Sequence, residues 1–110
     1  MPAVYVPDRG EIVWLQFNPQ SGHEQAGHRP ALVISPREYN RRVGLALFCP
    51  ITSKSKGYPF EVSVMAGSVQ GVVLADQIKS LDWQARNAKP AGRVPDNVID
   101  EVRGKLHTLI

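Results

Sequence analysis

Residues 23–30 of this 110-residue chain read HEQAGHRP, which places an acid, two imidazoles and a guanidinium within seven positions. Such groups can take a proton, return a proton and bind the oxygens of a phosphate. They need no activated serine or cysteine when the substrate supplies its own nucleophile, as a ribose 2′-hydroxyl does when it attacks the neighbouring phosphate. The inventory therefore suits cleavage of RNA by transphosphorylation.

Motifs for other chemistries are missing from the sequence. His23 and His28 stand five apart in a loop that contains glycine, and no CxxC pair occurs, so we expect neither a metal nor another cofactor. Glycine-rich phosphate loops and a GxSxG nucleophile elbow are also missing. Cys49 is the sole cysteine and lies in the apolar run LALFCPI, which predicts a buried structural thiol.

Arg29 is the first candidate for a phosphate contact. Pro30 biases Arg29 toward extended geometry, so the following strand directs its guanidinium, which can bind phosphate bidentately. The alternative is a strand-end arginine paired with a carboxylate. Glu24 or His28 is the candidate base: an exposed carboxylate is weak unless its surroundings raise its pKa, whereas histidine titrates near neutral pH. Both can equally be structural, Glu24 as a solvated loop residue and His28 as a strand-end residue bonded to backbone.

A second polar stretch follows the apolar run 45–51. Thr52 offers a hydroxyl to a phosphoryl oxygen, or caps the loop backbone. The lysines after it are flexible charges that suit backbone phosphates, although two lysines in a loop often serve only solubility. Asp76 alternates with two further polar residues in a predicted strand. The expected RNA contacts are Gln25, Ser53, Lys54, Lys56, Gln77 and Lys79.

Short apolar runs punctuated by glycine and proline predict an antiparallel, mainly β module. Strands are predicted over 12–17, 31–35, 45–51 and 60–64, with one bent strand or two over 71–83, a helical turn over 36–42 and a loop over 18–27. Residues 31–35 are apolar at every position but the last, as in a central strand, where alternation places Arg29, Ala31 and Val33 on one face. Glycine and proline interrupt the pattern again over 89–93.

The tail from Pro95 changes period and predicts an amphipathic helix. Val98, Val102, Leu106 and Leu109 form one stripe, and Pro95 suits the first helical position. We therefore expect a single domain, 1–110, built as a small, strongly curved sheet or barrel closed by a C-terminal α-helix.

The net charge is +3, and the surplus of basic residues lies entirely before Pro95, where an anionic partner is expected. The opening residues MPAVYVPDRG lack a secretory leader, and no apolar run is long enough to cross a bilayer. We expect a cytoplasmic protein with no membrane contact.

Four phrases, YVPDRGEIVWLQFNP, EQAGHRPALVISP, CPITSKSKGYPFEV and GVVLADQIKSLDWQAR, resemble in order the MazF/PemK family of toxin endoribonucleases, most closely its MazF branch. The resemblance implies a CcdB/PemK/MazF-like SH3-like barrel and a symmetric homodimer. It implies a sequence-specific, metal-independent, ribosome-independent mRNA interferase that cuts single-stranded RNA to 2′,3′-cyclic phosphate and 5′-hydroxyl ends. It also implies a type II toxin–antitoxin system with a MazE-like antitoxin whose extended tail occupies the RNA groove.

The resemblance also implies roles for single residues. Arg29 matches the arginine of the family's GHRP motif, which is implicated in stabilising the phosphate transition state. Thr52 matches the threonine of the P-[IV]-T element that accompanies it. Glu24 matches the loop acid, with His28 beside the arginine.

The chain departs from part of the family at one motif. That part has an arginine two residues before an aspartate and assigns both to catalysis, whereas this chain has Leu74 and Asp76, so that version of the site does not carry over. Two rival functions stay open. A gyrase poison of the CcdB type ends in Trp-Gly-Ile, whereas this chain ends in HTLI. A non-catalytic RNA-binding module would keep the groove without the chemistry.

Overall fold

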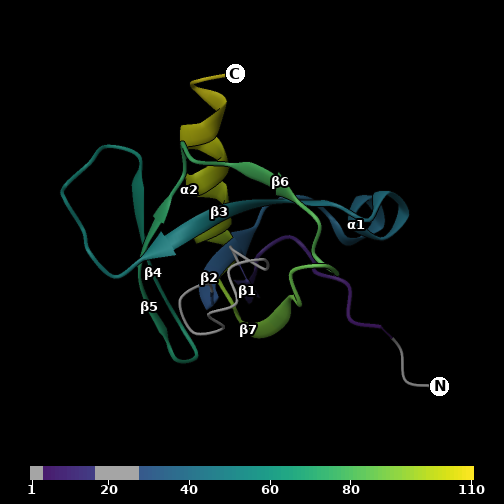
Figure 1. Ribbon diagram of the computed structural model, residues 1–110. Coiled ribbons are helices and arrows are strands. Elements are labelled where there is room, and N and C mark those ends of the chain that lie inside the picture. The colour runs from purple at the N-terminus through teal and green to yellow at the C-terminus, as the bar shows by residue number, and fades with distance from the viewer. Residues whose placement is uncertain (1–3, 17–27) are drawn as a thin grey trace.

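The computed structural model describes residues 4–16 and 28–110, which form a curled β-sheet with two helices (Figure 1). In chain order the elements are β1 Glu11–Gln16, β2 His28–Val33, α1 Arg37–Val43, β3 Ala46–Thr52, β4 Glu61–Ala66, β5 Val69–Leu74, β6 Lys79–Leu81, β7 Lys89–Arg93 and α2 Asp96–His107. The predicted class, mainly β with a C-terminal helix, is confirmed.

The sheet is antiparallel, with the order β4-β5-β3-β2-β1-β7, and β6 pairs with the first part of β3. β3 joins the two halves of the sheet, because its middle pairs with β2 and its last residues, Ile51 and Thr52, pair with β5. The sheet curls so far that the turn between β4 and β5 reaches β7, the strand at the other end of the order. The result is a half-barrel.

Two glycines permit this curl. Gly67, in the turn between β4 and β5, has φ +59°, and a Cβ there would lie 2.5 Å from the carbonyl oxygen of Ala91 in β7. Gly71, in β5, lies against β3, where a Cβ would stand 2.2 Å from the carbonyl oxygen of Thr52. Backbone segments approach each other this closely only where the side chain is missing.

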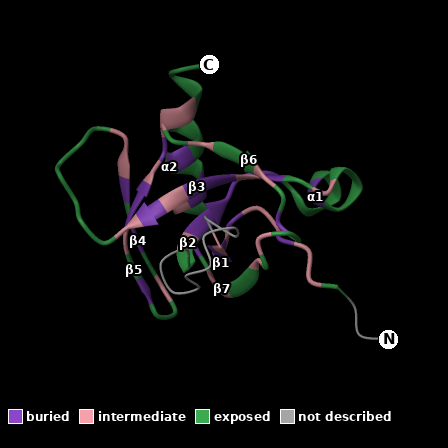
Figure 2. Cartoon of the chain, in the orientation of Figure 1, coloured by how far each residue is buried: buried purple, intermediate pink, exposed green. Residues whose placement is uncertain are grey.

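Apolar side chains pack on both faces of the central strands, where many residues are buried (Figure 2). Leu32 and Ile34 of the second predicted strand join the core that includes Ile99 and Val102 of α2, while Ala31 and Val33 join the core around Phe48 and Trp83 on the other face. The predicted alternation is therefore confirmed. Cys49 is fully buried, as expected, and burial raises the pKa of its thiol to about 12.

Helix α2 forms as predicted but differs from the expected stripe. Ile99 and Val102 are its buried residues, and the helix ends at His107, so Leu109 and Ile110 lie beyond it with exposed fractions of 53% and 86%. Pro95 precedes the helix as its N-cap rather than occupying the first helical position. Neither helix among the described residues has the length and hydropathy needed to cross a membrane.

Two other expectations are wrong in detail. Residues 89–93, where glycine and proline interrupt the pattern, form β7, which pairs with β1 at the end of the sheet. A proline is tolerated there because an end strand leaves one row of N–H groups without a neighbour. Asp76 and Gln77 lie in the turn between β5 and β6 rather than alternating in a strand. Phe17, expected at the end of the first strand, is outside the described residues.

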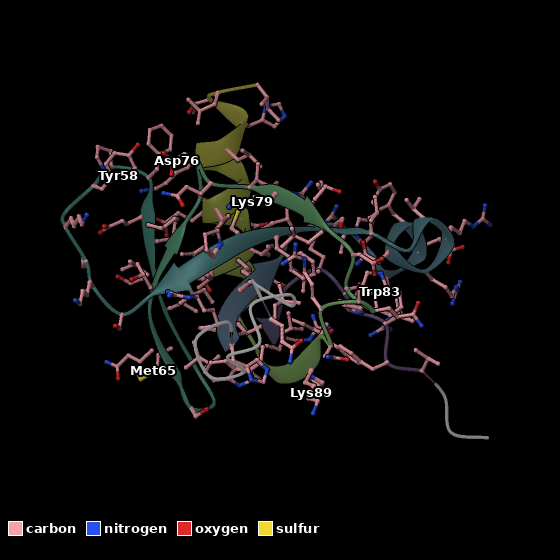
Figure 3. All side chains as sticks on the ribbon, in the orientation of Figure 1. Tyr58, Met65, Asp76, Lys79, Trp83 and Lys89 are labelled. Carbon is pink, nitrogen blue, oxygen red and sulfur yellow. The ribbon has the colours of Figure 1, made fainter. Side chains whose placement is uncertain are left out.

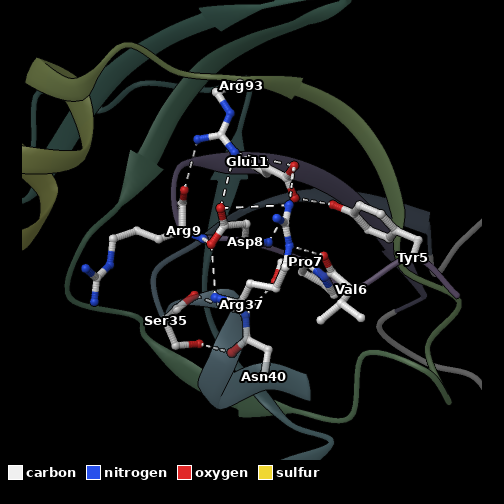
Figure 4. A network of polar contacts seen from close by, with 10 residues as sticks. All are labelled: Tyr5, Val6, Pro7, Asp8, Arg9, Glu11, Ser35, Arg37, Asn40 and Arg93. Atoms are coloured by element: carbon white, nitrogen blue, oxygen red, sulfur yellow. Dashed lines mark hydrogen bonds and ion pairs between the residues drawn. The ribbon is translucent and has the colours of Figure 1, made fainter. Parts of the chain in front are cut away.

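A charged network fixes the segment before β1 against α1 and β7 (Figure 4). Asp8 accepts the backbone N–H of Arg37 at 3.0 Å, and Arg37 and Arg93 each form ion pairs with both Asp8 and Glu11, at 3.5–3.8 Å. Glu11 also accepts the hydroxyl of Tyr5 at 2.5 Å, and burial together with this bond raises the pKa of Tyr5. The network holds the N-terminal segment to the rest of the sheet.

We predict that Gly71→Ala lowers the free energy of unfolding by about 1–3 kcal/mol, because the new methyl group forces β5 away from Thr52. The matched control is Gly104→Ala in α2, where a Cβ meets nothing within 4 Å. That change should raise stability by about 0.5–1 kcal/mol, since alanine favours a helix over glycine. Urea unfolding of both variants measures the contrast, and equal stabilities would contradict the close approach.

Candidate functional site

The start of β2 and the end of β3 border a hollow of about 530 Å³. The β2–β3 register pairs Ala31 with Pro50, and two residues further along each strand stand Arg29 and Thr52. Both line the hollow, so the structure brings together the two residues that the sequence proposed for the phosphate. The full lining is Trp14, His28, Arg29, Pro30, Ile51, Thr52, Ser53, Ser68, Val69 and Gln70.

Arg29 is exposed and carries a guanidinium that pairs with none of the described residues. The alternative of a strand-end arginine locked to a carboxylate therefore finds no support in the described part of the chain. The backbone of Arg29 lies in β2, opposite Leu15 of β1, and this pairing sets the direction of the side chain. A guanidinium that extends from a strand and has no partner in the described part of the chain is suited to bidentate phosphate binding.

Thr52 caps the loop after β3 and also keeps a donor. Its hydroxyl oxygen accepts the backbone N–H of Lys54 at 3.2 Å, which is the capping role foreseen as the alternative. That bond uses a lone pair and leaves the hydroxyl proton available to an oxygen in the hollow. The two interpretations of Thr52 are therefore compatible.

His28 lies exposed at the mouth of the same hollow. Its ring meets the edge of Trp14 with centroids 6.1 Å apart and an interplanar angle of 65°. Among residues 4–16 and 28–110, the imidazole has this aromatic contact and no hydrogen bond to the backbone. Trp14 is half-buried, packs against the core next to α2 and also forms a wall of the hollow. Glu24 and Gln25 lie outside the described residues.

A second hollow continues the surface past Thr52 and lies under the loop between β3 and β4. Lys54, Lys56 and Gln77, three of the expected RNA contacts, share its lining with Thr52, Tyr58 and Leu74. Neither lysine ammonium has a partner among the described residues. Lys79 belongs to β6 (Figure 3) and is absent from the linings of both hollows.

Gln70 is a site residue that the sequence did not reveal. It lines the hollow of Arg29 and also a third, neighbouring hollow that contains Ser53, Ser55 and Met65. Its sequence context, Ser68 and Gln70 alternating with valine, is that of an ordinary solvent-facing hairpin. The curl of the sheet alone brings this hairpin to the site, so no local signal identifies it.

Within the two described ranges, no group of three His, Cys, Asp or Glu side chains is placed to hold a metal ion. Three positively charged side chains, Arg29, Lys54 and Lys56, line the two hollows. Together with two hydroxyls, from Thr52 and Ser53, they form a surface suited to a chain of phosphates.

Comparison with known proteins identifies the family of this chain. Over residues 8–110 the chain matches the family described as PemK-like, MazF-like toxin of type II toxin-antitoxin system. It is 47% identical over 110 residues to the endoribonuclease toxin MazF of Escherichia coli strain K12, covering 100% of this chain and 99% of that protein. It is 35% identical over 108 residues to the endoribonuclease PemK of Escherichia coli, covering 94% and 81%.

Solved structures show the same relationship. MazF from Deinococcus radiodurans superposes with a TM-score of 0.86 at 57% identity, covering 96% of this chain and 97% of that one. A MazE–MazF complex from the same organism contains a chain with a TM-score of 0.86 at 51% identity, covering 96% of each. This chain belongs to the PemK-like, MazF-like family of endoribonuclease toxins of type II toxin–antitoxin systems.

Proposed function

We propose that the chain is a sequence-specific, ribosome-independent mRNA interferase that cuts single-stranded RNA without a metal ion. The observation that carries the proposal is the guanidinium of Arg29, which pairs with none of the described residues and lines one hollow together with Thr52. A guanidinium can neutralise the charge that develops on phosphoryl oxygens, which is the task a divalent cation performs in other nucleases. RNA is the proposed substrate because its 2′-hydroxyl supplies the nucleophile, so the protein needs no activated serine or cysteine.

In the proposed reaction the 2′-oxygen attacks the adjacent phosphorus. The bond between O2′ and phosphorus forms, and the bond between phosphorus and O5′ breaks. A base takes the proton of the 2′-hydroxyl and the departing O5′ gains a proton, which leaves a 2′,3′-cyclic phosphate and a 5′-hydroxyl. Arg29 binds the phosphoryl oxygens as their negative charge increases. The hydroxyl of Thr52 donates a hydrogen bond to one of these oxygens.

The base is His28 or Glu24. The exposed imidazole of His28 at the mouth of the hollow favours His28, because a base must come within reach of the proton that it removes. Glu24 keeps its candidacy through its match to the acid of the family motif. The pH–rate profiles of His28→Ala and Glu24→Gln identify the base. The base is the residue whose replacement removes the limb of the profile that reports deprotonation of the base.

The RNA path extends along the second hollow. Lys54 and Lys56 bind backbone phosphates in this hollow, and the side-chain amide of Gln77 can bond to base edges. The hydroxyl of Ser53, in the hollow of Arg29, can also bond to a base edge. Gln25 and Lys79 are proposed as further contacts from the sequence alone. Such contacts discriminate bases by about 1–3 kcal/mol each, enough for a short recognition word.

We also infer a homodimer and a cognate MazE-like antitoxin that covers the RNA path, both in the cytoplasm. The homodimer is supported by the family to which the chain belongs. Two of the related solved structures are MazE–MazF complexes from Deinococcus radiodurans, which supports an antitoxin partner for this chain.

We predict that Arg29→Ala lowers kcat by about 100-fold or more, the loss typical of removing one donor to a developing oxyanion. Arg42→Ala is the matched control, because Arg42 is 77% exposed on α1 and pairs with Glu38 instead of lining a hollow. Cleavage of a fluorogenic RNA oligonucleotide measures both. A folded Arg29→Ala variant with full activity would remove Arg29 from the mechanism.

We further predict that replacing the scissile ribose by 2′-deoxyribose abolishes cleavage and leaves the Kd nearly unchanged, because the substrate loses its nucleophile and little else. Gel-resolved cleavage and fluorescence anisotropy on the same pair of oligonucleotides provide the two readouts. Cutting of the deoxy analogue would show that water, not the RNA itself, attacks the phosphorus.

A further inference from the structure

The loop between β3 and β4 is exposed along residues 53–59 and yet is tied down at several points. Glu61 accepts the hydroxyl of Ser55 at 2.7 Å and the backbone N–H of Lys56 at 2.9 Å, and these bonds lower its pKa. From α2, Lys105 donates to the carbonyl oxygens of Pro59 at 2.7 Å and Glu61 at 3.2 Å. All of these anchors act on the loop from the side of β4.

A different bond ties the loop to the opposite wall of the second hollow. The hydroxyl of Tyr58 donates to Oδ2 of Asp76 at 2.6 Å, joining the loop to the turn between β5 and β6, where the two side chains lie next to each other in Figure 3. The bond raises the pKa of Tyr58, as expected for a phenol that donates to a carboxylate. The Tyr58 ring also packs against Phe60, with centroids 5.8 Å apart.

Asp76 has no oxygen directed at the hollow of Arg29. One carboxylate oxygen is taken by Tyr58, and the other, Oδ1, is buried without a hydrogen-bond partner among the described residues. Asp76 is also missing from the lining of that hollow. A general acid or base needs an oxygen within reach of the substrate, so this geometry does not suit Asp76 to proton transfer.

The Tyr58–Asp76 bond joins the two segments that line the second hollow. Lys54, Lys56 and Tyr58 line it from the loop, and Leu74 and Gln77 line it from the end of β5 and the turn after it. The Tyr58–Asp76 bond is the side-chain hydrogen bond, among the described residues, that joins the loop to this turn. Together with the backbone bond from the Ala75 N–H to the Phe60 carbonyl oxygen at 2.9 Å, it holds the loop that carries the lysines next to Gln77.

We propose that Tyr58 and Asp76 are positioning residues that hold the β3–β4 loop in the geometry that binds RNA. The inference rests on the proposed function, because it assigns the second hollow to the RNA backbone. Neither residue takes part in bond making or breaking. Their loss weakens RNA binding, whereas Arg29 and Thr52 continue to act on any RNA that is bound.

Tyr58→Phe tests the proposal, because it removes one hydroxyl and keeps the ring against Phe60. We expect KM to rise roughly 10-fold, the scale of a lost hydrogen bond to a charged group, with kcat within about 2-fold of the parent value. Tyr39→Phe is the matched control: Tyr39 is exposed on α1, and its hydroxyl bonds to none of the described residues. An unchanged KM in Tyr58→Phe would overturn the proposal.

Asp76 variants separate positioning from catalysis. The amide oxygen of Asp76→Asn still accepts the Tyr58 hydroxyl, so KM and kcat should stay within about 2-fold of the parent values. Asp76→Ala should match Tyr58→Phe, and the double variant should be no worse than either single one, because all three lose the same bond. A loss in kcat of about 100-fold in Asp76→Asn would make Asp76 a catalytic group and overturn the proposal.

A measurement on the free protein keeps this test apart from the proposed function. Backbone amide relaxation of residues 53–57, recorded by NMR without RNA, should show greater mobility in Tyr58→Phe and Asp76→Ala than in the parent and Asp76→Asn. Equal mobility in all four proteins would show that the Tyr58–Asp76 bond does not hold the loop, and would overturn this proposal even if the parent cleaves RNA. A parent that cleaves no RNA would refute the proposed function. The loop mobility would still show whether the Tyr58–Asp76 bond holds the loop.

Discussion

The backbone of β5 passes so close to Thr52 that a Cβ at position 71 would stand 2.2 Å from the Thr52 carbonyl oxygen. This contact fixes the corner at which β3 leaves β2 and begins to pair with β5. Thr52 is therefore delivered to the end of the sheet where β2 begins with His28 and Arg29. The same curl carries the β4–β5 hairpin to β7, so the site and the closure of the half-barrel depend on one backbone geometry.

The arginines near the sheet differ in whether they form ion pairs with the described carboxylates. Arg37 and Arg93 are paired with Asp8 and Glu11, where they stabilise the N-terminal segment, whereas Arg29 is left without a partner among the described residues. A guanidinium held in an ion pair must give up that pair before it binds a phosphate. A guanidinium without such a pair can bind a phosphate directly. This difference distinguishes Arg37 and Arg93, which stabilise the fold, from Arg29, which is proposed to act on the phosphate.

The sequence predicted what local rules decide and missed what depends on distant segments. Pro30 made Arg29 extended, and apolar alternation placed Ala31 and Leu32 in the cores on opposite faces. By contrast, β7 forms at Pro90 because β1 is available to pair with it, which no local pattern in residues 89–93 reveals. Gln70 enters the site through the curl of the sheet, and the bond from Tyr58 to Asp76 spans 18 positions, so neither has a signature in sequence spacing.

The chemistry of the new RNA ends tests the central claim most directly. A long RNA of defined sequence is incubated with the protein in the presence of EDTA, and the fragments are analysed by mass spectrometry. A guanidinium that stabilises attack by the RNA on itself must leave a 2′,3′-cyclic phosphate on one fragment and a 5′-hydroxyl on the other. Fragments that carry a 5′-phosphate and a 3′-hydroxyl, or cleavage that requires added metal, would contradict the account.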